Sequence, residues 1–270
     1  MLLFWILLTV VVCFFLYLYM IMPNTSRRSK ILPYLKRDYA HRGLHDSSRL
    51  IPENSMLAFR EEVKQNLAIE LDIHLTRDGK VVVFHDESLK RICNAEGTVE
   101  DSTFDTLQHL HLSGTSEHMP LFSDVLRYVN GRVPLLKLPD SNMKLCPAAW
   151  DILKDYKGPY MVQSFNSLGI RWFHKHAPQV LRGQLSSALT RTNPENPFLA
   201  RFCVQFLLTN LICRPDFISY KLADTGNPSV WLNHYLYRIP MAVWTLRNQK
   251  TYKTARNKYD MYIFEGFSVK

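Results

Sequence analysis

Three short polar clusters follow strand-like runs in the first third of this 270-residue chain. The first joins His41–Gly43 to Pro52–Ser55, the second is Glu70–Asp72 and the third is His85–Asp86. Side chains of these types exchange protons or bind ions, depending on their surroundings. A lone histidine beside a strand is more often structural than catalytic, so each cluster alone predicts little. Their order and spacing together are far more specific.

A turn joins the second and third clusters. The pair Asp78-Gly79 is typical of a two-residue hairpin loop, and such a loop joins only antiparallel strands. With these two residues as the loop, Asp72 is expected to lie opposite His85. Glu70 and Asp72 share one face of their strand because side chains alternate along it. Two carboxylates and a histidine are therefore predicted to converge on one side of a short hairpin.

The elements that must position these clusters are strands alternating with helices. Short β-branched runs alternate with helical patterns along the chain, which favours a parallel sheet. Helices are predicted at 54–65, 123–130 and 148–156. Strands are predicted at 38–41, 68–75, 81–85, 133–138, 161–164, 180–185, 217–220, 241–245 and 261–264.

Nine strands are one too many for a barrel of eight parallel strands, and the hairpin explains the surplus. The run 81–85 is expected to fold back on 68–75 and to lie outside the parallel set. The remaining length, about 230 residues, is close to the roughly 250 typical of such a barrel. We therefore predict an α/β fold, a TIM (β/α)8 barrel with a small hairpin insertion after its second strand.

An apolar segment at residues 2–22 precedes the barrel, and no charged side chain occurs before Arg27. Roughly 20 apolar residues suffice to cross a bilayer core as a helix. Trp5 near one end, with Tyr17 and Tyr19 near the other, suits the two membrane interfaces. A signal peptide would have a basic start, a shorter apolar run and a small-residue cleavage site. We predict an uncleaved, single-pass transmembrane anchor in the cell membrane.

The residues that flank this segment predict its orientation. No Lys or Arg precedes it, whereas Arg27, Arg28, Lys30, Lys36 and Arg37 follow it. The positive-inside rule then places the body of the protein in the cytoplasm, and the basic cluster suits anionic membrane lipids. The expected organisation is an anchor at 1–23, a basic juxtamembrane linker at 24–37 and the barrel at 38–270.

The overall composition limits the class of protein further. A hydrophobic content of 47% excludes a disordered chain, and a net charge of +9 favours an anionic partner. The basic residues are spread out, with neither a Lys/Arg-rich block nor an aromatic platform, so no nucleic-acid partner is expected. Of the five cysteines, Cys13 lies in the anchor, and the other four show no CxxC spacing and are expected to be small buried hydrophobes.

Together the motifs resemble the signature of the glycerophosphodiester phosphodiesterase family, in the form of a membrane-anchored bacterial-type member. The family pattern reads here as His41–Gly43, Glu53–Ser55, Ala58-Phe59, Glu70–Asp72, Thr76–Gly79 and His85-Asp86. Weaker matches continue at 163–165, 183–185 and 243–245. The resemblance implies a TIM barrel that hydrolyses glycerophosphodiesters or lysophospholipids. The products would be glycerol 3-phosphate or a lysophosphatidic acid, with an alcohol.

The resemblance also implies roles by position. His41 and His85 would be the general acid/base pair, which suits imidazole because it titrates at about pH 6.5. Arg42 would bind phosphate oxygens through its planar fork of donors. Glu70 and Asp72 would hold a divalent cation, Mg²⁺ or Ca²⁺, since these ions prefer oxygen ligands.

Three further residues near the expected substrate pocket have two interpretations each. Trp244 either forms a wall of the glycerol pocket or belongs to the barrel core. Glu53 and Asn54 either orient His41 or Arg42, or simply open the helix that follows.

The family pattern breaks at 133–139, where an acidic metal ligand normally stands in an E-x-K motif. Lys137 occupies either the Glu position of this motif or its Lys position. In the second case the Glu has been deleted from the chain before Lys137. We expect Lys137 to bind phosphate. One carboxylate is missing in both cases, with Asp140 as a candidate replacement. The expectation is a metal-dependent hydrolase with a weakened site. The alternative is a non-catalytic relative that binds phospholipid headgroups.

Two features near the end of the chain lie outside the pattern. The apolar run 198–213, in which Arg201 is the one charge, is either an outer barrel helix or a segment lying on the bilayer as a lid. Glu265 stands where the family often has Thr-Asp, and we expect it to cap the end of the barrel rather than to act.

Overall fold

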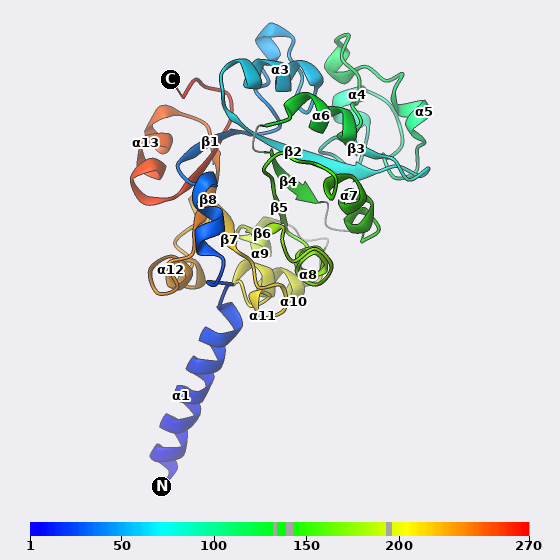
Figure 1. The fold of residues 1–270 in the computed structure, drawn as a ribbon. Helices are drawn as coiled ribbons and strands as arrows, with labels where there is room; N and C mark the ends of the chain where they lie inside the picture. Colours follow the sequence, from blue (N-terminus) through cyan, green and yellow to red (C-terminus); the bar gives the residue numbers. More distant parts are fainter. Residues whose placement is uncertain (132–133, 139–142, 193–195, 270) are drawn as a thin grey trace.

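The computed structural model describes residues 1–131, 134–138, 143–192 and 196–269, with backbone alone for 134–138. Within these ranges the sheet order is β1-β9-β8-β7-β6-β5-β4-β2-β3, and β1 also pairs with β2. Eight parallel strands therefore close into a barrel, with β3 attached to β2 as an antiparallel strand (Figure 1). The TIM-barrel prediction, including the hairpin, is confirmed.

All nine predicted strands are present, and their ends differ from the predicted ones by at most two residues. The strands are β1 (Arg37–Ala40), β2 (Ala68–Leu75), β3 (Val81–Val83), β4 (Pro134–Leu138), β5 (Met161–Ser164), β6 (Leu181–Ser186), β7 (Phe217–Lys221), β8 (Met241–Leu246) and β9 (Met261–Phe264).

Helices cover the outside of the barrel, and the run 198–213 forms two of them. Contact of this run with a bilayer stays a prediction. The longer helices are α3 (Met56–Lys64), α6 (Phe122–Val129), α7 (Leu145–Leu153), α8 (Ser167–His176), α10 (Phe198–Gln205), α12 (Pro228–Tyr235) and α13 (Gln249–Lys258). The short ones are α2 (Arg28–Ile31), α4 (Lys90–Cys93), α5 (Phe104–Leu107), α9 (Leu189–Thr192) and α11 (Asn210–Cys213).

The hairpin loop has three residues, not the predicted two. The Thr76 amide donates to the carbonyl of Lys80 at 2.9 Å, so the loop is Arg77–Gly79. Gly79 has φ +76°, the left-handed conformation that closes a three-residue loop of this kind. The Thr76 hydroxyl adds hydrogen bonds to the Asp78 carboxylate and the Lys80 carbonyl. These side-chain contacts stabilise the longer loop, and the dipeptide signal does not report them.

The longer loop shifts the register of the hairpin by one residue. The Phe84 amide donates to the carbonyl of Asp72 at 3.0 Å, so Phe84 and not His85 lies opposite Asp72. The prediction for this pair was wrong. His85 follows the end of β3 and lines the same cavity as Glu70. The two side chains therefore lie near each other as expected, although His85 is not paired with Asp72.

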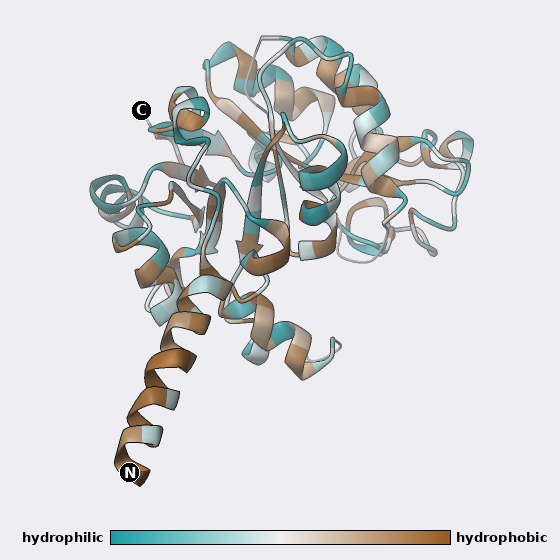
Figure 2. Cartoon of the chain, turned by 60° about the horizontal axis from the view of Figure 1, so that its bottom comes forward, coloured by the Kyte–Doolittle hydropathy of each residue, from teal (hydrophilic) through white to brown (hydrophobic). Residues whose placement is uncertain are grey.

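Helix α1 (Leu2–Ile21) projects away from the barrel (Figures 1 and 2). In the described part of the chain it is the one helix long and apolar enough to cross a membrane. Its inner end is held between α11 and α12. Asn210 of α11 donates to the carbonyl of Ile21 at 2.8 Å, and the Tyr17 hydroxyl lies 2.7 Å from that of Ser229 on α12.

The segment 24–37, expected to be a linker, is folded against the barrel. Arg27 forms an ion pair with the buried Asp216 at 3.2 Å, next to the start of β7. Helix α2 follows, and its last residue, Ile31, is completely buried with Met261 at the amino ends of the strands. The sequence analysis did not predict this contact, because basic residues surround Ile31 in the sequence. Helix α1 is therefore joined to the barrel through a packed connection.

Candidate active site

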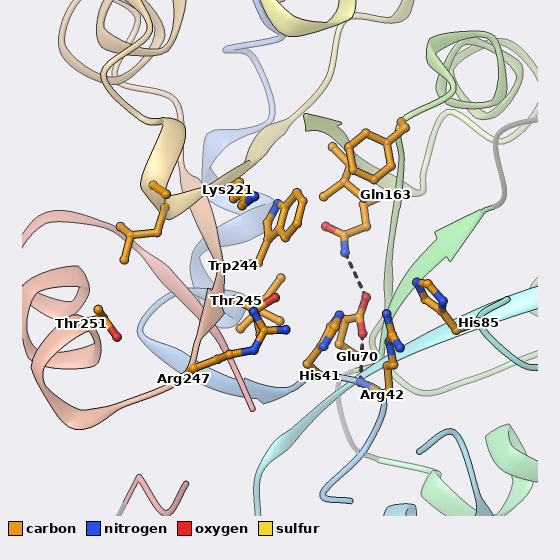
Figure 3. Close-up of a pocket in the computed structure, with 15 residues that line it drawn as sticks. His41, Arg42, Glu70, His85, Gln163, Lys221, Trp244, Thr245, Arg247 and Thr251 are labelled. Atoms are coloured by element: carbon orange, nitrogen blue, oxygen red, sulfur yellow. Dashed lines mark hydrogen bonds between the residues drawn. The ribbon is translucent and has the colours of Figure 1, made fainter. Parts of the chain in front are cut away.

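A cavity of about 550 Å³ opens at the carboxyl ends of the barrel strands, where active sites of TIM barrels lie. In Figure 3, His41 and His85 stand on either side of Glu70 and Arg42. Residues far apart in the chain meet here because each lies in or shortly after a barrel strand or, for His85, after the attached strand β3. The residues that carry the argument are His41, Arg42, Glu70, His85, Gln163 and Trp244.

His41 is held by Glu265, a residue that the sequence analysis assigned to a cap. Strand β1 pairs with β9 so that Ala40 lies beside Phe264. The residues that directly follow the two strands are His41 after β1 and Glu265 after β9. Glu265 Oε2 lies 3.1 Å from His41 Nδ1. This hydrogen bond, with the nearby charge of Arg247, lowers the pKa of Glu265 to about 2 despite partial burial. Glu265 follows the last strand of the barrel as expected, and the pairing of β1 with β9, which no local motif reports, also places it against His41.

His85 has a carboxylate partner of the same kind. Its Nδ1 lies 2.6 Å from Asp86 Oδ1, and Arg91 Nη2 donates to the same oxygen at 2.8 Å. Burial alone would raise the pKa of Asp86, but the hydrogen bonds from Arg91 and His85 outweigh it and lower the pKa to about 2. Both histidines thus have Nδ1 bound to an ionised carboxylate, which fixes the orientation of the rings.

Glu53 links the two histidine clusters. It accepts a hydrogen bond from Arg42 Nη1 at 2.7 Å and two from Arg91, at 2.7 and 3.0 Å. Burial would raise the pKa of Glu53, but the two arginines outweigh it and lower the pKa. Glu53 is not among the residues that line the cavity. Glu53 therefore contacts Arg42, one of the two residues it was expected to orient, and its place in a substrate pocket stays a prediction.

Glu70 and Asp72 are only 2% and 3% exposed, and each is held by donors. The Arg42 backbone amide donates to Glu70 at 3.1 Å and the Gln163 side-chain amide donates to it at 3.4 Å. Asn54 donates to Asp72 at 3.2 Å, so Asn54 lies behind the cavity as a support for this carboxylate. Arg42 Nε also lies 3.6 Å from Asp72. The two predicted metal ligands and the predicted phosphate ligand are thus brought together.

A tight turn after β1 directs Arg42 toward this group. Arg42 and Gly43 both have left-handed backbone conformations, with φ of +59° and +81°. A Cβ atom at Gly43 would lie 2.9 Å from the Cβ of Ala58 on α3. Glycine is therefore required at position 43 both by the left-handed backbone and by the close approach of Ala58. This contact gives a physical reason for the pairing of His41–Gly43 with Ala58-Phe59 in the motif.

The cavity offers oxygen atoms that suit a divalent cation. In the ranges that the structure describes, no three His, Cys, Asp or Glu side chains gather as a metal cluster. Gln163 offers a further oxygen, because its Oε1 is buried without a hydrogen-bond partner among the described residues. Glu70, Asp72 and Gln163 supply oxygen atoms of the kind that Mg²⁺ and Ca²⁺ prefer, and in this structure Gln163 directs its amide nitrogen, not Oε1, toward Glu70. The residues present fit such an ion.

The break in the motif falls largely outside the described side chains. The backbone of Lys137 lies on β4, paired with Asp72 on one side and Gln163 on the other. Its side chain and the whole of Asp140 are outside the described residues. The predicted phosphate contact of Lys137 therefore stays a prediction.

Trp244 lines the cavity from β8. Its ring packs edge-on against Phe165, with centroids 5.8 Å apart at 85°. Its indole Nε1 has no hydrogen-bond acceptor in the part of the chain that the structure describes. Trp244 thus lines the cavity and also packs against the barrel core, and its place in a glycerol pocket stays a prediction.

Solved structures share the fold over most of the chain. A phosphodiesterase from Oleispira antarctica, in complex with the product sn-glycerol-3-phosphate, is 20% identical, with a TM-score of 0.69 over 86% of this chain and 94% of that one. A glycerophosphodiester phosphodiesterase from Thermotoga maritima is 23% identical, with a TM-score of 0.65 over 84% of this chain and 93% of that one.

Curated relatives are closer in sequence. A glycerophosphodiester phosphodiesterase of Caldanaerobacter subterraneus is 31% identical over 54% of this chain and 65% of its own length. Glycerophosphodiester phosphodiesterase 1 of the mouse is 33% identical over 76% of this chain and 57% of its own length. The chain spans between about a quarter and two thirds of the length of the curated relatives it matches. Residues 41–270 match the Glycerophosphoryl diester phosphodiesterase family, and the chain therefore belongs to that family.

Proposed function

We propose that the protein hydrolyses glycerophosphodiesters to sn-glycerol 3-phosphate and an alcohol. The observation that carries this proposal is the pair of cavity histidines, each with Nδ1 bound to an ionised carboxylate. Arg42 and Glu70 lie between them in Figure 3. Two oriented bases on either side of an anion-binding guanidinium suit a reaction that moves a proton at each end of a phosphodiester.

The proposed proton transfers follow from this arrangement. One imidazole takes a proton from the attacking water, whose oxygen forms the new P–O bond, and the other imidazole donates a proton to the leaving oxygen of the alcohol. The P–O bond to the alcohol breaks as the new P–O bond forms. Glu265 and Asp86 stay ionised at neutral pH and stabilise the imidazolium that each transfer creates. The Arg42 guanidinium binds the non-bridging phosphate oxygens.

Glu70, Asp72 and Gln163 Oε1 would hold Mg²⁺ or Ca²⁺, and the ion would neutralise charge on the phosphodiester. The amide oxygen of Gln163 would replace the carboxylate that the motif lacks near Lys137. A neutral ligand contributes less to affinity than a carboxylate does, so the ion is expected to bind more weakly than in a site with three acids.

Release of glycerol 3-phosphate from glycerophosphocholine by the full chain tests the proposal. Turnover is expected with Mg²⁺ or Ca²⁺ and is expected to stop with EDTA. His41→Ala and His85→Ala should abolish turnover, whereas His109→Ala, an exposed histidine away from the cavity, should not. Wild-type turnover by either cavity variant would refute the assigned roles. Binding of glycerophosphocholine by the native chain without any turnover would favour a headgroup-binding relative instead.

We infer that α1 anchors the protein in the cell membrane, with the barrel in the cytoplasm. The five basic residues after α1 support this orientation. The protein is expected to stay with membranes during an alkaline carbonate wash, and to be digested by protease only in inverted vesicles. Mature protein that begins after residue 22 would identify a signal sequence instead.

A further inference from the structure

Two exposed histidines face each other across a short antiparallel bridge, and neither of them lines the catalytic cavity. The bridge pairs His111 with His118. The next residue after each of them, Leu112 and Met119, is buried in an apolar cluster beneath, with no more than 2% exposed. Because successive side chains of an extended chain point to opposite sides, the two imidazoles lie next to each other at the surface.

A backbone carbonyl holds each of the two rings. His111 Nδ1 lies 2.8 Å from the carbonyl oxygen of Thr115, and His118 Nδ1 lies 3.1 Å from that of Leu110. A carbonyl oxygen only accepts hydrogen bonds, so Nδ1 carries the hydrogen in both rings and Nε2 of the neutral imidazole has the free lone pair. Neither Nε2 has a hydrogen-bond partner among the residues that the structure describes. The surface therefore presents two neighbouring nitrogen atoms that can each bind a metal ion.

The distance between the rings also suits a shared ion. The ring centroids of His111 and His118 are 4.6 Å apart. Two imidazoles on one ion, with metal–nitrogen bonds of about 2.0–2.1 Å and tetrahedral or square geometry, place their ring centres roughly 4.5–5 Å apart. A metal-binding histidine also usually donates its other N–H to a carbonyl or carboxylate, which fixes the ring. Both properties of a ligating pair are therefore present without any movement of the backbone.

We propose that His111 and His118 together bind one late first-row metal ion, of the class of Zn²⁺ or Cu²⁺, through their Nε2 atoms. Imidazole nitrogen suits these ions, whereas Mg²⁺ and Ca²⁺ prefer oxygen ligands. In the described ranges no third His, Cys, Asp or Glu gathers with the pair. Water therefore completes the coordination of the ion, which binds more weakly than in a closed site with four protein ligands.

The ion would close a loop that supports α3. The Leu112 amide donates to the carbonyl of Glu117 at 2.8 Å, directly inside the histidine pair. Glu117 Oε2 in turn accepts a hydrogen bond from the Leu57 amide in the first turn of α3, at 2.9 Å. Helix α3 begins directly after Ser55, the last residue of a sequence motif. The proposed role of the ion is thus structural, and its site is separate from the oxygen ligands around Glu70.

Calorimetric titration with Zn²⁺ tests this proposal. The full chain, in detergent and without an affinity tag, is titrated in excess Mg²⁺, which competes for the oxygen ligands of the catalytic cavity. We expect one Zn²⁺ site per chain that Mg²⁺ does not displace. His111→Gln and His118→Gln are each expected to weaken this binding by more than about tenfold. His109→Gln is the matched control, because His109 is exposed and outside the pair, and it is expected to keep the affinity.

Hydrogen exchange shows whether the ion closes the loop. The Leu112 amide, bonded to Glu117 inside the pair, is expected to exchange more slowly with Zn²⁺ than without it. The same slowing is expected in His109→Gln and is expected to be absent in His111→Gln. Titration with Cu²⁺ is expected to rank the variants in the same order with tighter binding, because Cu²⁺ binds nitrogen ligands more strongly than Zn²⁺ does.

Several results would overturn the proposed site. Affinity for Zn²⁺ that neither His111→Gln nor His118→Gln lowers would show that the ion lies elsewhere. A loss in only one of these variants would show that a single histidine holds the ion, and an equal loss in His109→Gln would show that the pair is not the site. Unchanged exchange at Leu112 would exclude closure of the loop. None of these measurements involves hydrolysis, so their failure leaves the proposed function in place.

Discussion

Replacing Glu265 by glutamine removes the charge that holds His41 and nearly keeps the shape of the side chain. In the native protein, Glu265 Oε2 lies 3.1 Å from His41 Nδ1 and 3.0 Å from Arg247 Nη2. The amide of glutamine can still accept a hydrogen bond, but it cannot stabilise a positive imidazolium. The change therefore isolates the electrostatic contribution of Glu265 to proton transfer by His41.

The size of the effect follows from the pKa of Glu265. A fall from an ordinary 4.5 to about 2 corresponds to about 3 kcal/mol. The Glu265 side chain is 24% exposed and shares its charge with Arg247, so solvent screening reduces the useful part to about 1–2 kcal/mol. The carboxylate contributes this stability above about pH 4.5, and the contribution is lost as the pH falls through about 2.

The assay is the steady-state hydrolysis of glycerophosphocholine at neutral pH. Glu265→Gln is expected to lower kcat by about tenfold, the equivalent of about 1.4 kcal/mol, and to change KM much less. Glu96→Gln is the matched control, because Glu96 is 86% exposed in its ion pair with Lys90. Wild-type kcat in Glu265→Gln, or an equal loss in Glu96→Gln, would refute the reasoning.

Three further predictions concern other parts of the site. Gly43→Ala is expected to lower the free energy of unfolding in urea by about 1–3 kcal/mol, because it combines a close contact with a left-handed backbone; Gly226→Ala, in open space, is its control. Gln163→Glu is expected to raise the affinity for Mg²⁺ or Ca²⁺ in calorimetry by roughly tenfold, since a charged ligand replaces a neutral one, and unchanged affinity would exclude Gln163 as a ligand. Arg91→Met is expected to lower kcat by about tenfold, because it removes charge-assisted hydrogen bonds to Asp86 worth about 1.5–3 kcal/mol; full activity would show that His85 needs no such support.

The barrel could be predicted from the sequence because its signals are local. Alternating β-branched runs located all nine strands, and three of them, including β2 and β9, have the predicted ends. The hairpin register could not be predicted in the same way. It depends on hydrogen bonds of the Thr76 side chain inside the loop, and a dipeptide pattern contains no information about them.

The site was predictable to the extent that its residues belong to contiguous motifs. His41, Arg42, Glu70 and His85 do, and all four line one cavity. Glu265 does not, because its role depends on the pairing of β1 with β9 across more than two hundred residues. A closed barrel requires its first and last strands to pair, so that signal was available in the topology rather than in any motif.

The pairing of β1 with β9 also has a consequence for biosynthesis. Strand β1 is the first strand of the barrel to leave the ribosome, and its partner β9 is the last strand of the barrel to be made. Until β9 arrives, one edge of β1 is unpaired, and an exposed strand edge is a site for association with other chains. The nascent barrel thus stays open until β9 has been made. His41 acquires its carboxylate partner only in the final stage of folding, so partly synthesised chains are expected to be inactive.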